Sequence, residues 1–167
     1  MLKGKKLTVK EARGLKEDEL QEYDCYTYNI VKKALLYVPK IATGHDDVRG
    51  LWIVGAPGVG KSRFARETYP GAYIKSITKW FDGYNGEDTI LLDDFDIMPN
   101  TREANEYGHF FKIWADRYPC YGEVKGGTVA LCHTKFVVTS NYEPDDIWGV
   151  GVMLTAILRR FEIKCMK

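Results

Sequence analysis

One eight-residue loop, Gly55–Ser62 with the sequence GAPGVGKS, constrains the fold of this 167-residue chain more than any other feature. The apolar run Leu51–Val54 before the loop predicts a buried strand, and Arg63–Glu67 after it predicts the first turns of a helix. A strand, a glycine-rich loop and a helix in this order form a phosphate-binding loop. A glycine-rich loop alone is often only a turn, but a Lys-Ser ending in this context favours a nucleoside triphosphate site.

The residues of this loop have distinct expected roles. Glycines allow the backbone to bend until successive N–H groups point into one concavity, and the following helix adds partial positive charge there. Lys61 would reach the β- and γ-phosphates of ATP, and the Ser62 hydroxyl would bind Mg²⁺. The residues expected to bind the nucleotide are Gly55, Pro57, Gly58, Gly60, Lys61 and Ser62.

Two more apolar runs end in polar residues, as the first one does. Asp93 and Asp94 follow the run 89–92, and Asn141 follows the run 135–140. Because ligands of a parallel sheet bind beyond the carboxyl ends of its strands, the three ends should converge. Asp93 suits the Mg²⁺ shell, and Asp94 could polarise the attacking water. Asn141 could hydrogen-bond the γ-phosphate and that water, although Asn is also common in turns.

The rest of the pattern predicts alternating strands and helices. Helices are expected over 102–118 and 153–160, strands over 72–75 and 161–164, and a hairpin that turns at Gly126-Gly127. The side chains expected to be buried on the first of these helices are Phe110, Phe111, Ile113 and Trp114. Such alternation favours an α/β fold with a mainly parallel sheet.

The pattern also divides the chain into two parts. Residues 1–41 carry apolar residues at helical spacing, notably over 26–37, and predict a small helical unit. The polar stretch 43–47 closes this region. The nucleotide-binding core is then expected over residues 42–167.

Two basic features remain. Lys125 lies beside the Gly-Gly turn, where a positive charge could contact a nucleic-acid backbone, although an exposed lysine at a turn is common. Arg159 and Arg160 are adjacent near the end of the last expected helix, where paired arginines are usually solvated. An arginine supplied across a subunit interface would instead stabilise charge on a transferred phosphoryl group, which requires an oligomer.

Composition excludes a few classes of protein. A hydrophobic content of 45% with 28% charged residues is ordinary for a soluble globular protein. The formal net charge is +1, so any surface that binds DNA must be local or must be built by assembly of several subunits. No apolar run approaches the roughly 18 residues that a membrane-spanning helix needs, so no membrane partner is expected.

The order of further motifs is more specific than the phosphate-binding loop. These motifs are KWFDGYNGE at Lys79–Glu87, ILLDDF at Ile90–Phe95, DRYP at Asp116–Pro119, VKGGT at Val124–Thr128 and VVTSN at Val137–Asn141. With them, the chain from about Val9 to its end resembles the superfamily 3 helicase domain of replication-associated (Rep) proteins. These proteins belong to circular single-stranded DNA viruses, the circoviruses and their relatives.

The resemblance implies an AAA+-like ATPase that forms a hexameric ring and moves 3′ to 5′ on single-stranded DNA, serving rolling-circle replication. By this analogy Lys125 contacts DNA from a pore-facing hairpin, and Asn141 is the sensor of hydrolysis. Arg160 resembles the finger given to the neighbouring subunit, with Arg159 as the alternative. The segment before Ala42 resembles an oligomerisation collar. For a eukaryotic virus, the family also implies the host nucleus as the location.

The resemblance has one departure, and two other functions stay open. Members of the family carry an N-terminal endonuclease with a His-x-His-type motif and a nicking tyrosine, which the three isolated histidines do not supply. We therefore expect an excised helicase domain or a shortened relative, with the endonuclease as an absent partner.

The alternatives to a helicase function are a small-molecule kinase, which would need a lid carrying arginines, and an assembly or packaging ATPase without strand separation.

Overall fold

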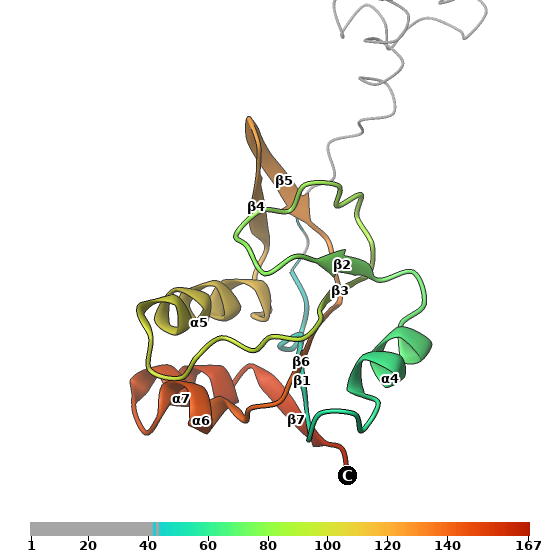
Figure 1. Cartoon of the computed structure of the whole chain (residues 1–167). Helices are drawn as coiled ribbons and strands as arrows, with labels where there is room; N and C mark the ends of the chain where they lie inside the picture. Colours follow the sequence, from blue (N-terminus) through green and yellow to red (C-terminus); the bar gives the residue numbers. More distant parts are fainter. Residues whose placement is uncertain (1–41, 43) are drawn as a thin grey trace, which may run out of the picture. The chain divides into compact units, whose positions relative to one another are not determined.

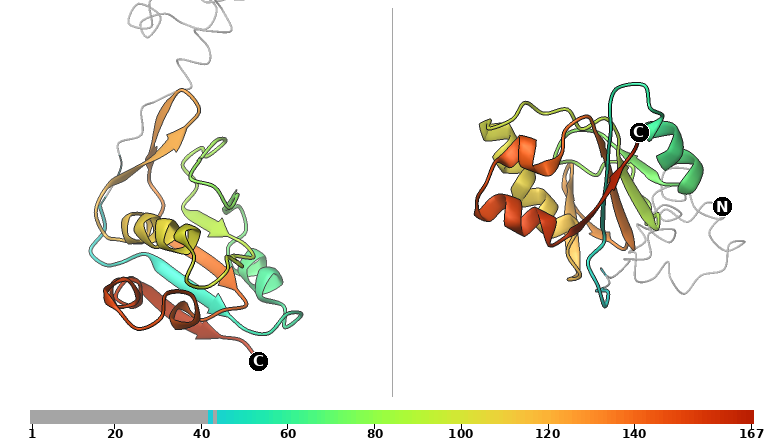
Figure 2. Two further views of the ribbon diagram at one scale, coloured as in Figure 1. Left: turned by 60° about the vertical axis from the view of Figure 1, so that its left-hand side comes forward. Right: turned by 90° about the horizontal axis from the view of Figure 1, so that it is seen from below.

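The computed structural model describes residue 42 and residues 44–167, which form a parallel β-sheet with helices on both faces (Figure 1, Figure 2). This arrangement confirms the expected α/β class and is that of a P-loop nucleotide-hydrolase core. The helical segment expected over residues 1–41, and its boundary with the core, lie outside the described residues. None of the described helices is long and apolar enough to cross a membrane.

The main sheet has five strands within the described residues, in the order β2-β3-β6-β1-β7. Their bounds are β1 Gly50–Val54, β2 Tyr73–Lys75, β3 Thr89–Leu92, β6 Lys135–Ser140 and β7 Phe161–Cys165. Every neighbouring pair is parallel. Strand β6 therefore lies between the strand before the phosphate-binding loop and the strand before Asp93.

Strand β1 shows why these strands read as continuous apolar runs. Trp52 and Val54 face one hydrophobic core, whereas Leu51 and Ile53 face a second core on the opposite side of the sheet. All four side chains are buried, because successive residues of a strand point to opposite faces and both faces are covered.

Helices form the two outer layers. Their bounds are α4 Lys61–Thr68, α5 Arg102–Trp114, α6 Pro144–Trp148 and α7 Val152–Leu158. Helix α4 covers one face of the sheet, and α5, α6 and α7 cover the other (Figure 1, Figure 2). Thr101 caps α5 by accepting a hydrogen bond from the N–H of Ala104 at 3.1 Å.

Two local expectations were wrong, and one helix was not expected. Helix α5 ends at Trp114, with Ala115 as its C-cap, and does not reach Tyr118, which precedes Pro119 and is therefore disfavoured in helical conformation. Ile113 lies on the outer side of α5 and is 50% exposed, whereas it was expected to be buried. Helix α6 was not expected. Pro144 occupies its first turn, directly after the N-cap residue Glu143, and Glu143 and Asp146 form a capping box there.

The expected hairpin is present and stands apart from the main sheet. Strands β4 (Cys120–Val124) and β5 (Gly127–Leu131) pair antiparallel, and the hairpin projects away from the sheet and its helices (Figure 1, Figure 2). Gly126 has a φ of 89°, a left-handed conformation that suits glycine in a tight turn. Lys125 is exposed next to it at the tip.

Candidate active site

The predicted site residues meet at one edge of the sheet, beyond the carboxyl ends of β1, β3 and β6. There they line a cavity of about 460 Å³. The lining residues are Pro57, Gly58, Gly60, Lys61, Ser62, Arg63, Asp94, Asp96 and Asn141. Most of the predicted nucleotide-binding residues therefore surround one space, and Gly55 and Asp93 lie outside its lining.

The glycines of the loop have two different structural roles. Gly58 and Gly60 have φ values of 85° and 90°, and an added Cβ at either position would meet nothing within 4 Å. These two residues thus need glycine for backbone conformation, and they leave open space at the cavity wall. Gly55 instead needs glycine for packing, since a Cβ there would lie 2.6 Å from the carbonyl oxygen of Met166.

Lys61 is the first residue of α4 and joins two of the three strand ends. Its Nζ donates hydrogen bonds to the carbonyl oxygens of Gly55 at 2.8 Å and Ala56 at 3.0 Å. It also donates to Oδ1 of Asn141 at 2.8 Å. With its side chain only 5% exposed, the ammonium group is held between the phosphate-binding loop and the end of β6.

Asp93 is surrounded by hydrogen-bond donors from three elements. Its Oδ1 accepts from the Thr139 hydroxyl at 2.7 Å, and its Oδ2 forms an ion pair with Arg66 at 2.9 Å. Ser62 also donates to this carboxylate. Burial raises the pKa of Asp93, but the hydrogen bonds from Thr139, Ser62 and Arg66 outweigh it and hold the pKa below its ordinary value. Asp93 therefore stays ionised at neutral pH.

Asp94 differs from its neighbour in conformation and exposure. It is exposed, lines the cavity and has a φ of 54°, in the left-handed region that is uncommon outside glycine. Its N–H donates to the Thr139 hydroxyl at 2.9 Å, and the next N–H, that of Phe95, donates to the Thr139 carbonyl at 2.8 Å. The turn after β3 is thus fixed against β6, and the Asp94 carboxylate is left facing the cavity.

The polar groups that surround this cavity fit a nucleoside triphosphate with Mg²⁺. The ammonium group of Lys61 and the start of α4 supply positive charge for phosphate oxygens. The Ser62 hydroxyl already contacts the ionised Asp93, and hydroxyl and carboxylate oxygens are ligands that Mg²⁺ accepts. The open space beside Gly58 and Gly60 lets a phosphate approach the backbone.

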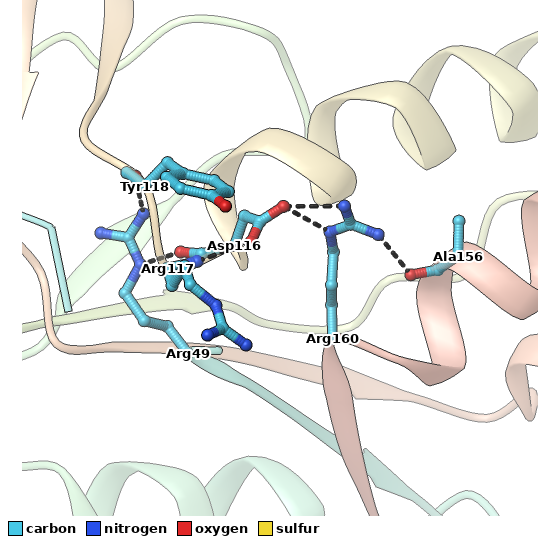
Figure 3. Close-up of polar contacts among 6 residues, drawn as sticks. All are labelled: Arg49, Asp116, Arg117, Tyr118, Ala156 and Arg160. Carbon is cyan, nitrogen blue, oxygen red and sulfur yellow. Dashed lines mark hydrogen bonds and ion pairs between the residues drawn. The ribbon is translucent and has the colours of Figure 1, made fainter. Parts of the chain in front are cut away.

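The other basic residues that were predicted to be functional, Lys125 and the pair Arg159-Arg160, lie away from this cavity. Arg160 directly precedes β7, whose first residue pairs with Gly50 at the start of β1, so it lies at the amino edge of the sheet. Its guanidinium forms an ion pair with Asp116 at 2.7 Å (Figure 3). A five-residue strand spans about 16 Å, which separates this edge from the phosphate-binding loop. Lys125 lies on the hairpin tip, and its N–H donates to Asp82 at 3.0 Å.

Four residues of the site were not predicted. Thr139 connects both acidic residues, Arg66 pairs with Asp93, and Arg63 and Asp96 line the cavity. Thr139 could have been found, because it lies two residues before Asn141 on a strand that was predicted to be buried. Arg66 could not, since exposed arginines on helices are common.

Known proteins resemble this chain in sequence. A family model described as RNA helicase matches residues 51–141, more than half of the chain, from β1 to Asn141. The replication-associated protein of goose circovirus is 40% identical over 111 residues, covering 65% of this chain and 35% of that protein. That of beak and feather disease virus is 36% identical over 110 residues, covering 65% of this chain and 35% of that protein.

A solved structure is also similar, at greater distance. The crystal structure of JCV helicase with a bound acetamide compound has a TM-score of 0.46 and 14% identity, over 90% of this chain and 40% of that chain. The chain matches about a third of the length of its viral relatives. It belongs to the RNA helicase family, and its resemblance to the superfamily 3 helicase domain of circovirus replication-associated proteins is confirmed.

Proposed function

We propose that this chain is the ATP-driven motor of a DNA helicase that serves replication of a circular single-stranded DNA genome. The observation that carries the proposal is the contact of Lys61 with Asn141 at the edge where three strands end, beside the paired carboxylates. A lysine, an amide and carboxylates around one cavity suit phosphoryl transfer to water, which depends on positioning and charge stabilisation.

The roles of the site residues follow from their positions. Lys61 and the loop N–H groups would bind the β- and γ-phosphates of ATP. Ser62 and Asp93 would hold Mg²⁺, which neutralises charge on the phosphates when bound. Asp94 would orient and polarise the attacking water from its exposed position, and Asn141 would contact both the γ-phosphate and that water.

The proposed partner is single-stranded DNA, which Lys125 would contact from the hairpin tip. The net charge of the whole chain is only +1, so the positive charge has to be concentrated locally. A hexameric ring would bring six copies of the tip into one channel. By resemblance to the family we further propose 3′ to 5′ movement, an AAA+-like subunit arrangement and action in the host nucleus.

The proposal requires subunits that share active sites. Arg159 and Arg160 lie at the amino edge of the sheet, about one strand length from the phosphate-binding loop of their own chain. An arginine at that edge can reach a triphosphate only if the triphosphate is bound by another copy. Hydrolysis should therefore depend on protein concentration.

The test is ATP hydrolysis measured with and without single-stranded DNA, together with the oligomeric state. We expect DNA-stimulated hydrolysis by an oligomer, abolished by Lys61→Ala. Lys125→Ala should weaken DNA binding and leave hydrolysis without DNA unchanged. Lys164→Ala is the matched control, because Lys164 is exposed on β7, in register with Ile53 and far from the hairpin.

Three results would contradict the proposal. Oligomers that form with nucleotide but show no turnover would indicate an assembly module, and phosphate transfer to a small acceptor would indicate a kinase. A chain that stays monomeric at high concentration with ATP analogue and DNA present would exclude shared active sites.

A further inference from the structure

Lys75, the last residue of β2, is buried and forms no ion pair within the part of the chain that the structure describes. The residue is only 2% exposed. Its Nζ donates hydrogen bonds to the carbonyls of Ser76 at 3.3 Å, Thr78 at 2.6 Å and Trp80 at 2.9 Å. Burial lowers the pKa of Lys75 to about 8, so the charged ammonium form prevails at pH 7.

Aromatic rings complete the surroundings of this ammonium group. Its nitrogen lies 4.3 Å from the centroid of the Phe81 ring and 4.9 Å from that of the Trp114 ring. A desolvated cation is attracted to the face of a ring, and the backbone carbonyls supply its hydrogen-bond acceptors. One charge therefore holds the backbone of the residues after β2 in a closed turn. Without it, these carbonyls would lose a donor.

The segment 76–82, called the support loop from here on, lies beside the hairpin (Figure 1). The N–H of Phe81 donates to the carbonyl of Glu123 on β4 at 2.8 Å. At the tip, Oδ1 of Asp82 accepts a hydrogen bond from the N–H of Lys125 at 3.0 Å. The support loop thus contacts β4 and also fixes the backbone of the residue that is proposed to contact DNA.

The feet of the hairpin are held separately, by Arg49. This residue is 1% exposed and directly precedes β1. Its Nη2 donates to the carbonyl of Tyr118 at 2.9 Å, before β4 (Figure 3), and its Nη1 donates to the carbonyl of His133 at 3.1 Å, after β5. One guanidinium fixes both feet to the start of β1. The position of the tip therefore depends on the second support, further along β4.

We propose that Lys75 is a positioning residue for the binding of single-stranded DNA, because its ammonium group orders the support loop that holds Lys125 in place. This inference rests on the proposed function, since that function assigns the DNA contact to Lys125. Lys75 itself cannot touch DNA, because it is buried beside the rings of Phe81 and Trp114. Its loss should change DNA affinity without removing any group that contacts DNA.

The first test removes the charge of Lys75 and keeps the length of the side chain. Lys75→Met should weaken binding of single-stranded DNA at least about fivefold, because the carbonyls of the support loop lose their donor. Lys164→Met is the matched control, since it removes the same charge from an exposed residue of β7. Val137→Ala, in the core on the α4 side of the sheet, controls for loss of stability alone. If Lys75→Met folds and binds DNA as tightly as both controls, the inference is wrong.

Chemical rescue tests whether the N–H donors of the ammonium group are what matters. Lys75→Ala leaves room for propylammonium, which matches the atoms that the substitution removes. Propylammonium should restore the DNA affinity of Lys75→Ala toward that of the wild type. Tetramethylammonium at the same concentration carries the same charge but has no N–H group for the carbonyls. Equal effects of the two cations would overturn the role of the carbonyl contacts.

The contact between the support loop and the tip is tested at an exposed residue, where the fold is not at risk. Asp82→Asn and Asp82→Ala remove the same negative charge, but only asparagine keeps the oxygen that accepts from the N–H of Lys125. We expect Asp82→Ala to bind DNA at least about threefold more weakly than Asp82→Asn. Equal affinities would show that the support loop does not set the position of the tip.

Amide hydrogen exchange separates failure of this inference from failure of the proposed function, because it needs no DNA. In Lys75→Met, amides of the support loop and of residues 122–125 should exchange at least about tenfold faster than in the wild type, with β1 unchanged. If the wild type binds no DNA, the proposed function fails, whatever the exchange shows. If the wild type binds DNA and exchange in the support loop is the same in Lys75→Met, the inference fails.

Discussion

The Thr139 hydroxyl donates a hydrogen bond to Asp93 and accepts one from the N–H of Asp94, at 2.7 and 2.9 Å. One side chain on β6 thus fixes both acidic residues that follow β3. Because Thr139 is fully buried, neither hydrogen bond can be replaced by bulk water. The positions of the two carboxylates depend on the neighbouring strand as much as on their own.

Replacement of Thr139 by valine should therefore disturb the acidic pair while keeping the shape of the side chain. We expect Thr139→Val to lower the free energy of unfolding by about 1–3 kcal/mol at pH 7. The pKa of Asp93 should rise, since a hydrogen bond that lowers it is lost. In a plot of the hydrolysis rate against pH, the decline on the acid side should therefore move to higher pH. Urea unfolding and a pH–rate profile measure both effects. Thr139→Ser keeps the hydroxyl and should show neither; an unchanged Thr139→Val would refute this role.

A negative charge at position 141 should weaken nucleotide binding. Asn141→Asp places a carboxylate 2.8 Å from the Lys61 ammonium, where it would compete with phosphate oxygens for the same donor. We expect affinity for an ATP analogue to fall at least about tenfold, with a larger loss than in Asn141→Ala. Binding is measured by titration at fixed ionic strength. Equal affinities of the two variants would mean that Lys61 does not mediate the effect.

The sequence predicted that the site lies at this edge of the sheet, because the carboxyl ends of parallel strands meet at one edge in every such sheet. Apolar runs that end in polar residues require that Asp93, Asp94 and Asn141 lie beyond neighbouring strand ends, whatever the details of the helices. The contact of Lys61 with Asn141 agrees with that rule, although the two residues are 80 positions apart in the chain.

Side-chain partners between distant segments could not be predicted in the same way. Asp116 and Arg160 are separated by 44 positions and lie in segments expected to be helical, where both would ordinarily be solvated. No role was predicted for Arg49, because an arginine before a strand has no sequence pattern that indicates one. Its role depends on the fold, which brings the Tyr118 carbonyl before β4 and the His133 carbonyl after β5 to the start of β1.

His133 should make stability depend on pH. The side chain is fully buried, its Nε2 lies 2.7 Å from the Trp114 carbonyl, and burial together with the Arg49 charge lowers the pKa to about 3. The neutral imidazole is the stable form in the folded chain. Stability from this group is therefore complete above the unfolded pKa of about 6.5 and decreases as pH falls from there toward about 3.

The expected decrease reaches about 1.4 kcal/mol per pH unit below pH 6.5, the amount for one proton. The measurement is the free energy of unfolding in urea at pH 7, 6 and 5, a window above the ordinary range of carboxylates. His133→Asn should flatten this slope, whereas His109→Asn, at an exposed position of α5, should leave it unchanged. Identical slopes in the two variants would show that His133 is not the titrating group.

Gly122 lets strand β4 of the hairpin pack on Phe81, and alanine at this position should tilt the hairpin. A Cβ on Gly122 would lie 2.5 Å from Cδ2 of Phe81, a side chain that is fully buried and has no room to move. We expect Gly122→Ala to weaken binding of single-stranded DNA several-fold and to leave hydrolysis without DNA unchanged. Gly127→Ala is the matched control, because a Cβ there meets nothing within 4 Å. Phe81→Leu should restore DNA binding to Gly122→Ala by making space; failure of this rescue, with the fold intact, would show that steric contact with Phe81 does not set the hairpin position.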